Sequence, residues 1–441
     1  MTLTADAFRP MPAEAAPRTR AAEMDFIVKV FTIEMVVVVV TQKIAVPFGS
    51  AATSQVALAL LVHAGVLTLL ALRGVLRIAK HSLVFFAGFT FMAGLGAVLL
   101  ASPNYSVMSL LLLLIISSFY VFRVHLDWEH YMKWLANFQL IAVAAAGLLF
   151  FNWATQFIGL GLVDLNSIIP RKLLYLHYNY IQPIHWGSPW MKPNAVFFLE
   201  TSHISQFIAM AIVIELTCFF RIRYLAFFGA ALLSSFGGTG MLTLALTAPF
   251  LLGRVPRGLL LAGILALPLA YIGASSIGLT SNIESRIGEF GSRGTSGEMR
   301  FSRPAEAVTD AMFGDEADLF IGKGAGSMPK GQSAKGANFA WAPYAKVFVE
   351  YGIVAFIFWA LLILTTMFGH GVPFAISWVV FLQYQFMNGS LNVPLHTIYA
   401  MLLAGGVVVA AREAPRTVGG LAARFGPPRL PPAGRPSMTR A

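Results

Sequence analysis

Apolar runs of roughly 20 residues recur along the chain, separated by short polar or basic segments. A helix of that length rises about 1.5 Å per residue and matches the hydrocarbon core of a bilayer. The runs lack the strict alternation that is typical of membrane β-barrels, and hydrocarbon satisfies no backbone polar group, so each run predicts a helix. We therefore expect an all-α polytopic membrane protein.

The boundaries of these runs predict about 12 transmembrane helices. They fall at about 25–45, 54–72, 82–100, 105–122, 136–160, 195–219, 225–237, 239–253, 258–277, 345–368, 373–388 and 393–411. The stretch 225–253 is short for two ordinary spans and long for one. Its middle, Ser234–Gly240, fits either a tight hairpin or a broken, re-entrant helix.

Basic residues cluster in the short loops on one side of this arrangement. They are Arg73, Arg77, Lys80, Arg123, Lys133, Arg221, Arg223, Arg254 and Arg257. Loops rich in Lys and Arg usually face the cytosol. In the twelve-span arrangement both termini lie on the same side as these loops, so they are expected in the cytosol too. The chain then divides into a cytosolic tail (1–24), a transmembrane domain (25–411) and a basic, proline-rich, disordered cytosolic tail (412–441). The loops 161–194 and 278–344 lie outside, and the second separates spans 9 and 10.

Composition agrees with this class of protein. Of 441 residues, 57% are hydrophobic and 12% charged, with a mean hydropathy of +0.72, so one soluble core could not hide the apolar side chains. The loops explain the net charge of +11, so membrane lipid is the expected partner and nucleic acid is not. The single cysteine, Cys218, forms no intrachain disulfide. No metal-ligand spacing or dinucleotide fingerprint occurs, so neither metal nor cofactor is expected.

The head of the sixth predicted span, Phe197–Phe207, is unusually polar. Glu200, His203 and Gln206 recur at a spacing of three, which places them on one side of a helix. A carboxylate at that depth is costly, so it should face the bundle interior or a water-filled cavity. A polar clamp between helices is the alternative. Glu215, nearer the cytosolic end, is expected to form an interfacial ion pair with Arg221 or Arg223.

The long outer loop concentrates charge. Arg286, Arg293, Arg300 and Arg303 fall within 18 residues. Guanidinium groups grip phosphate oxygens with two parallel hydrogen bonds, which suits a lipid-linked phosphate or pyrophosphate, although acidic neighbours must pair with several of them. Further on, Lys323 lies in the glycine-rich stretch Gly322–Ser327, an amide-rich turn that could form an anion nest but lacks the P-loop spacing.

Five motifs together resemble the O-antigen polymerase and ligase superfamily, most closely its exopolysaccharide polymerase branch, which includes the xanthan polymerase. They are Pro193–Phe207, Ser235–Gly240, Ser296–Phe301, Gly322–Ser327 and Phe348–Gly352. Their order and spacing carry the resemblance, which covers residues 190–360. It implies a bacterial inner-membrane enzyme that joins oligosaccharide repeat units carried on undecaprenyl pyrophosphate, at the periplasmic face, by metal-independent inverting glycosyl transfer. A chain-length regulator and export proteins are implied partners.

The resemblance also implies roles for particular residues. Arg300 matches the loop arginine of the family best, and the departing pyrophosphate would also meet Arg286, Arg293, Arg303 and Lys323. Glu200 or His203 would serve as the base. The sugar-binding candidates are Asn194, Gln206, Trp341 and Tyr344.

Two alternatives stay open: an O-antigen ligase or another polyprenyl-phosphate glycosyltransferase, and a secondary transporter. The ligase branch usually has a histidine and an asparagine just before the helix that starts near Phe348, where this chain has Trp341-Ala-Pro-Tyr344. That departure disfavours a ligase, and the two aromatics would either stack on sugars or anchor the interface. A secondary transporter would suit twelve helices and a break near Gly237, but the charge lies at the outer mouth and no internal repeat is visible.

Overall fold

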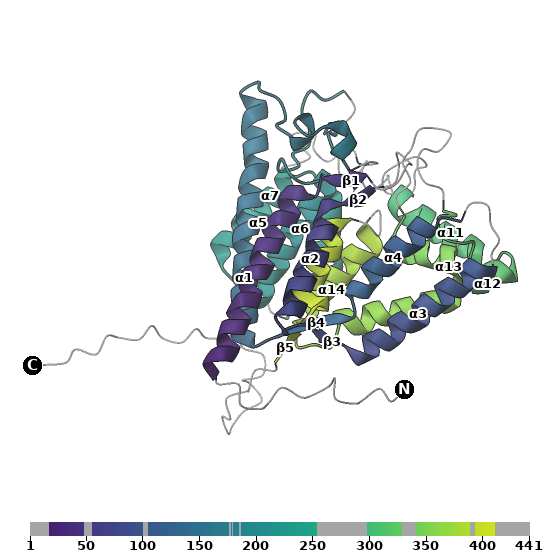
Figure 1. Cartoon of the computed structure of the whole chain (residues 1–441). Coiled ribbons are helices and arrows are strands. Elements are labelled where there is room, and N and C mark those ends of the chain that lie inside the picture. Colours follow the sequence, from purple (N-terminus) through teal and green to yellow (C-terminus); the bar gives the residue numbers. More distant parts are fainter. Residues whose placement is uncertain are drawn as a thin grey trace, which may run out of the picture.

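The computed structural model describes residues 17–47, 55–99, 105–253, 298–328, 341–388 and 393–410, apart from 176, 177, 179, 185 and 186. Helices dominate these residues (Figure 1). Their bounds are α1 Pro17–Thr41, α2 Leu58–Leu72, α3 Lys80–Leu99, α4 Val107–Phe119, α5 Trp128–Phe157, α6 Thr201–Ile214, α7 Ile222–Ser234, α8 Gly238–Leu251, α11 Arg303–Met312, α12 Glu316–Ile321, α13 Pro343–Met367, α14 Phe374–Leu382 and α15 Pro394–Ala400. Short 3₁₀ turns cover Leu165–Ser167 (η2) and Arg171–Leu173 (η3).

Four helices in the described part of the chain are long and apolar enough to cross a membrane: Lys80–Leu99, Trp128–Phe157, Thr201–Phe219 and Pro343–Met367. The helical fold class is thereby confirmed. The predicted span 258–277 and most of the loop 278–344 lie outside the described residues, so the number of spans and the position of that loop stay predictions.

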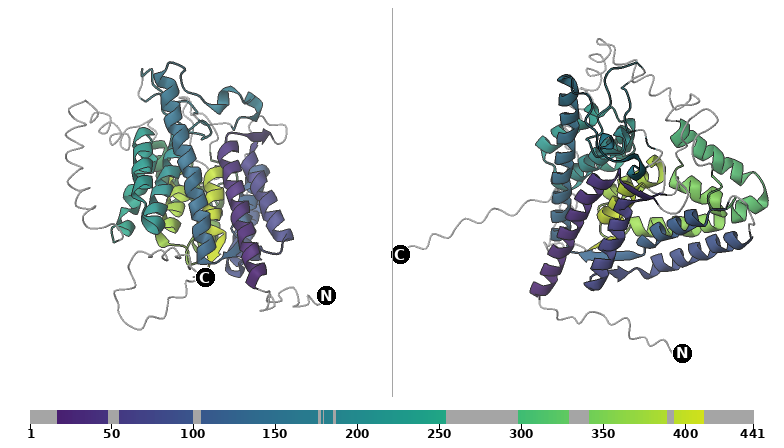
Figure 2. Two further views of the ribbon diagram at one scale, coloured as in Figure 1. Left: turned by 90° about the vertical axis from the view of Figure 1, so that its left-hand side faces the viewer. Right: turned by 45° about the horizontal axis from the view of Figure 1, so that its top comes forward.

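The helices form two groups with different inclinations. α1, α2, α5 and α6 run roughly parallel, whereas α3 and α13 lie side by side and steeply inclined to them (Figures 1 and 2). The segment 158–200 covers the end of the first group where α1 and α5 stop and α6 begins, which we call the loop end. The first turn of α1 and the strand β5 (Val407–Val409) both lie toward the opposite end (Figure 1).

Within the described ranges, five short strands interrupt the helices, and the hydrophobic pattern did not predict them. β1 (Ala45–Pro47) pairs antiparallel with β2 (Gln55–Ala57) at the loop end. At the opposite end, which we call the sheet end, β4 (Phe122–Leu126) pairs antiparallel with β3 (Arg77–Ile78) and parallel with β5 (Val407–Val409). Arg123, expected in an exposed basic loop, is buried within β4, where its guanidinium donates to Ser82 Oγ at 3.0 Å and to the Tyr120 carbonyl at 2.9 Å.

The last two predicted spans contain only short α-helices. α14 continues as the π-turn η6 (Gln383–Met387), and α15 as the π-turn η7 (Met401–Gly405) before β5. Buried aromatic donors from α5 hold η7: Trp134 Nε1 donates to the Leu402 carbonyl and Tyr131 OH to the Leu403 carbonyl, each at 2.9 Å. Side chains distant in sequence thus satisfy carbonyls where the regular helix is lost.

The region 225–253 contains two short helices joined by the turn Ser235–Gly237. α7 and α8 are 13 and 14 residues long and both pack on α6. The chain can pass this close to the start of α6 because the residues in contact with Ser205 are glycines, which have no Cβ atom. A Cβ at Gly237 would lie 2.4 Å from Ser205 Cβ, and one at Gly240 would lie 2.3 Å from the Ser205 carbonyl oxygen.

We predict that Gly240→Ala lowers the stability of the protein by about 1–3 kcal/mol, because backbone atoms of α6 must move to admit the methyl group. Gly229→Ala in α7 is the matched control, since nothing lies within 4 Å of its Cβ position. Melting temperatures of the two purified variants test this prediction. Equal melting temperatures would mean that the close approach of α6 and α8 does not matter.

Candidate functional site

The polar stretch that drew attention in the sequence lies at the loop end, but α6 starts later than predicted. The helix begins at Thr201 rather than near 195, so Glu200 is its N-cap residue and not part of its second turn. Ala195 and Val196 adopt left-handed backbone angles, with φ of 53° and 67°, which excludes a helix there. The first helical turn nevertheless follows Glu200 directly, so Glu200 and His203 stay close in the chain.

Glu200 and His203 are both buried in the structure. Glu200 is 7% exposed and accepts a hydrogen bond from Ser202 Oγ at 3.2 Å. His203 is 4% exposed, and its ring centroid lies 5.9 Å from that of Tyr178 and 5.1 Å from that of His396. A carboxylate and two imidazoles therefore gather under the segment 158–200.

Gln206 joins this group to two later segments of the chain. Its Oε1 accepts a hydrogen bond from His396 Nε2 at 2.6 Å, and its backbone carbonyl accepts one from Gln383 Nε2 at 2.9 Å. Tyr399 OH donates to Gln383 Oε1. His396, Gln383 and Tyr399 were not predicted as site residues; their only signal in the sequence is that they are polar residues within the apolar runs 373–388 and 393–411.

The π-turn η6 connects this group to the charged loop. Gln383 at its start binds α6, while η6 also contacts the π-turn η5 (Glu298–Ser302), which contains Arg300. Gln385 is 3% exposed, and neither atom of its amide has a hydrogen-bond partner among the described residues. Buried amides are almost always paired, so Gln385 is a candidate to contact a ligand.

The four loop arginines are only partly described. Arg286 and Arg293 lie outside the described residues, and of Arg300 only the backbone position in η5 is known. Arg303 begins α11 and its Nε donates to Glu298 Oε1 at 3.2 Å, which agrees with the expectation that some of these arginines form salt bridges. The structure thus brings the Arg300–Arg303 segment next to η6 and, through η6, near α6.

Lys323 and its glycine-rich stretch pack against α13. The amides of Lys323 and Gly324 donate to the carbonyls of Val349 and Glu350, at 2.9 and 3.0 Å, just before α13 breaks at Gly352. Those two amides are therefore occupied and cannot bind an anion. The Lys323 side chain is exposed and lies 3.7 Å from Asp318 Oδ2.

The two aromatic candidates lie at the start of α13. Tyr344 contacts Phe386 of η6, with ring centroids 5.2 Å apart. Trp341 is partly buried against Met328, Phe348 and Val349. Tyr344 is thus next to the π-turn that joins the two halves of the candidate site, whereas Trp341 packs against a separate small hydrophobic cluster.

A buried ion pair supports the loop end. Lys43 Nζ lies 2.6 Å from Asp164 Oδ2, and Asn194 Nδ2 donates to the same carboxylate. Burial together with the Asp164 and Glu200 carboxylates raises the pKa of Tyr180. Asn194, a sugar-binding candidate, therefore has both ends of its amide engaged by protein groups.

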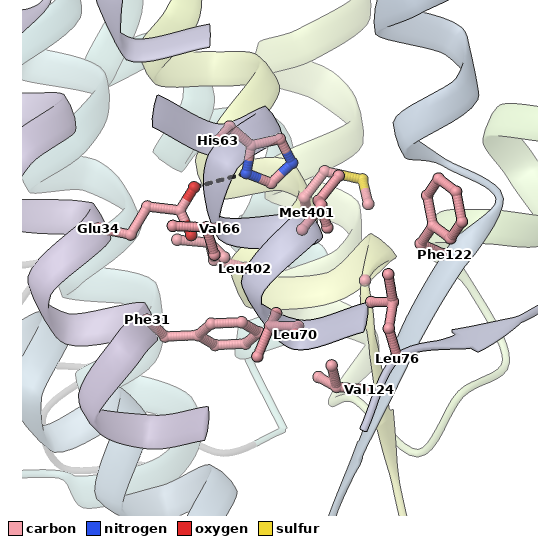
Figure 3. Close-up of a pocket in the computed structure, with 12 residues that line it drawn as sticks. Phe31, Glu34, His63, Val66, Leu70, Leu76, Phe122, Val124, Met401 and Leu402 are labelled. Atoms are coloured by element: carbon pink, nitrogen blue, oxygen red, sulfur yellow. Dashed lines mark hydrogen bonds and ion pairs between the residues drawn. The ribbon is translucent and has the colours of Figure 1, made fainter. Parts of the chain in front are cut away.

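A second ionisable pair lies deeper among the helices (Figure 3). His63 Nδ1 of α2 is 2.5 Å from Glu34 Oε1 of α1, and both side chains are buried. They line a small pocket whose other walls, among them Phe31, Leu70 and Met401, are apolar. Glu34 Oε2 and His63 Nε2 have no partner in the described part of the chain. This pair was not predictable from the sequence, because 29 residues separate its members.

Glu215 behaves as predicted, since both its oxygens accept hydrogen bonds from the Arg221 guanidinium at the end of α6.

Among the described residues, no group of three His, Cys, Asp or Glu side chains could hold a metal ion. Comparison with known proteins assigns no family: no protein-family model matches the chain, and no curated protein matches it.

Proposed function

We propose that this protein is a bacterial inner-membrane glycosyltransferase that polymerises oligosaccharide repeat units linked to undecaprenyl pyrophosphate. The reaction takes place at the loop end, which faces the periplasm, while both termini lie in the cytosol. The product is a surface polysaccharide or exopolysaccharide. The resemblance of the five sequence motifs is the starting point of this proposal, and the arrangement of the polar residues supports it.

The observation that carries the proposal is the contact of η6 with both α6 and η5. One π-turn joins the buried Glu200, His203 and Gln206 group to the segment that contains Arg300 and Arg303. A polymerase needs a base beside an acceptor hydroxyl and cationic groups beside a departing pyrophosphate. These two kinds of residue come from positions about 100 apart in sequence and are brought to the same turn.

In the proposed reaction, Glu200 or His203 accepts the proton of an acceptor hydroxyl while its oxygen attacks the anomeric carbon of the donor. The bond from that carbon to the pyrophosphate oxygen breaks, and the configuration inverts. Arg300, with Arg286, Arg293, Arg303 and Lys323, stabilises the charge that grows on the pyrophosphate. Gln206 and Tyr344 line the sugar side. No metal or other cofactor has a role in this scheme.

Deletion of the gene tests the proposal in cells. High-molecular-weight polysaccharide should disappear while lipid-linked single repeats persist, because assembly of the repeat does not need the polymerase. Loss of the single repeats as well would place the protein earlier in assembly. An unchanged amount of high-molecular-weight polysaccharide in the deletion strain would rule out the proposed function.

We predict that reporter fusions at residue 330 and at the C-terminus give opposite readouts, because 278–344 is expected outside and the C-terminus inside. An alkaline phosphatase fusion should be active at 330 and inactive after 441, and a cytosolic fluorescent reporter should show the reverse. Equal readouts at both positions would overturn the proposed orientation.

A secondary transporter is the competing function, and the Glu34–His63 pair favours it. Ionisable residues within a membrane bundle often mark proton or ion pathways. The two functions differ in what the protein does in a sealed vesicle: a transporter moves a solute without making a glycosidic bond. An O-antigen ligase would share the polymerase chemistry and differ in its acceptor.

A further inference from the structure

The backbone before α6 is held in an unusual conformation. Ala195 and Val196 are consecutive non-glycine residues with positive φ. A β-branched residue is a rare occupant of this region, which persists only where the surroundings determine it. The position of Glu200, four residues further on, therefore depends on the groups that fix Asn194–Val196.

Lys43 provides the central contact. It lies two residues beyond α1, is fully buried, and donates from Nζ to the Val196 carbonyl at 2.7 Å as well as to Asp164 Oδ2 at 2.6 Å. The Leu165 amide donates to the same Val196 carbonyl at 3.3 Å. Lys43 thus ties the left-handed turn to the end of α1 and to Asp164.

Asn194 completes the arrangement from within the turn. Its Oδ1 accepts from the Val196 amide at 3.1 Å, while its Nδ2 donates to Asp164 Oδ2 and to the Tyr180 carbonyl, the latter at 3.0 Å. We call Lys43, Asp164 and Asn194 the clamp. Beside it, Gln42 Oε1 accepts from the Leu199 amide at 3.3 Å, so the residues after α1 hold both ends of the segment that leads to Glu200.

We propose that Lys43 and Asp164 are positioning residues for the proposed glycosyl transfer, because they fix the left-handed turn and through it the place of Glu200 and His203. This inference rests on the proposed function. Neither residue needs to touch the sugars, since both act through the Val196 carbonyl and the Asn194 amide.

A double-mutant cycle with Lys43→Met and Asp164→Asn tests the clamp. Removing one partner leaves a buried charge unpaired, whereas removing both leaves a neutral pair. Each single change should raise hydrogen exchange of the amides of residues 195–200 at least about tenfold, and the double variant should lose less protection than the two single effects combined. The exposed pair Lys133–Asp25 is the matched control, and Lys133→Met and Asp25→Asn should leave this exchange unchanged.

The rate of polymerisation at equal protein level distinguishes a positioning role of Lys43 and Asp164 from a general effect on stability. In a reconstituted polymerisation assay, each single clamp variant at equal protein level should lower the maximal rate about tenfold or more. The donor concentration at half-maximal rate should stay the same. Altered exchange with a normal rate would overturn positioning while leaving the proposed function intact. Wild-type protein that makes no polymer would remove the proposed function, and exchange would still show whether the clamp holds the turn.

Discussion

Glu200→Gln should abolish most polymer formation, with a rate at least about 100-fold below that of the wild type, because an amide cannot accept the proton of the acceptor hydroxyl. The substitution keeps the shape of the side chain and can still accept from Ser202 Oγ, which lies 3.2 Å from Glu200 Oε2. The amount of protein in the membrane should therefore stay the same. Polymer length and amount, normalised to protein level in a complemented deletion strain, give the measurement.

The exposed carboxylate Glu129, in the first turn of α5, provides the control for this result. Glu129→Gln should leave polymer unchanged. If Glu200 is only a clamp between helices, glutamine should replace it well, and Glu200→Ala should lower protein abundance. Near-normal polymer from Glu200→Gln together with that loss of abundance would exclude Glu200 as the base.

Arg300→Ala should also remove polymer without lowering protein level, because a residue in the short turn η5 contributes little to helix packing. Loss of one preorganised donor to a departing oxyanion costs about 10²- to 10³-fold in rate. Arg300→Lys should fail as well, since lysine cannot form the two parallel hydrogen bonds of a guanidinium with phosphate.

Arg223, exposed at the start of α7, is the matched arginine control, and Arg223→Ala should leave the rate unchanged. Normal polymer from Arg300→Ala would remove Arg300 from the site. Full activity of Arg300→Lys beside an inactive Arg300→Ala would mean that charge alone, and not bidentate geometry, is needed.

The predictions that were confirmed concern groups that lie close together in sequence. The cost of a carboxylate in an apolar run drew attention to Glu200, and the mismatch between the length of 225–253 and a bilayer pointed to an irregular element there. The ion pair of Glu215 with Arg221 was also predictable, because six residues separate them at a helix end. In each case the interacting groups lie close together in sequence.

The partners that complete the candidate site could not be predicted from one sequence. His396 lies 190 residues from Gln206, and Lys43 lies 121 residues from Asp164. In a membrane segment almost every position is apolar, so periodicity does not show which face meets which helix. The late start of α6 has the same cause, since the side chains of Lys43 and Asn194 bind the backbone of Val196 outside a helix.

Purified protein in sealed vesicles, supplied only with a repeat unit linked to undecaprenyl pyrophosphate, tests the proposed polymerase most directly. The expected result is a ladder of glycans that grows by one repeat, with one undecaprenyl pyrophosphate released for each new linkage and none from Glu200→Gln vesicles. Vesicles that translocate a solute or the lipid-linked repeat but form no glycosidic bond would contradict it.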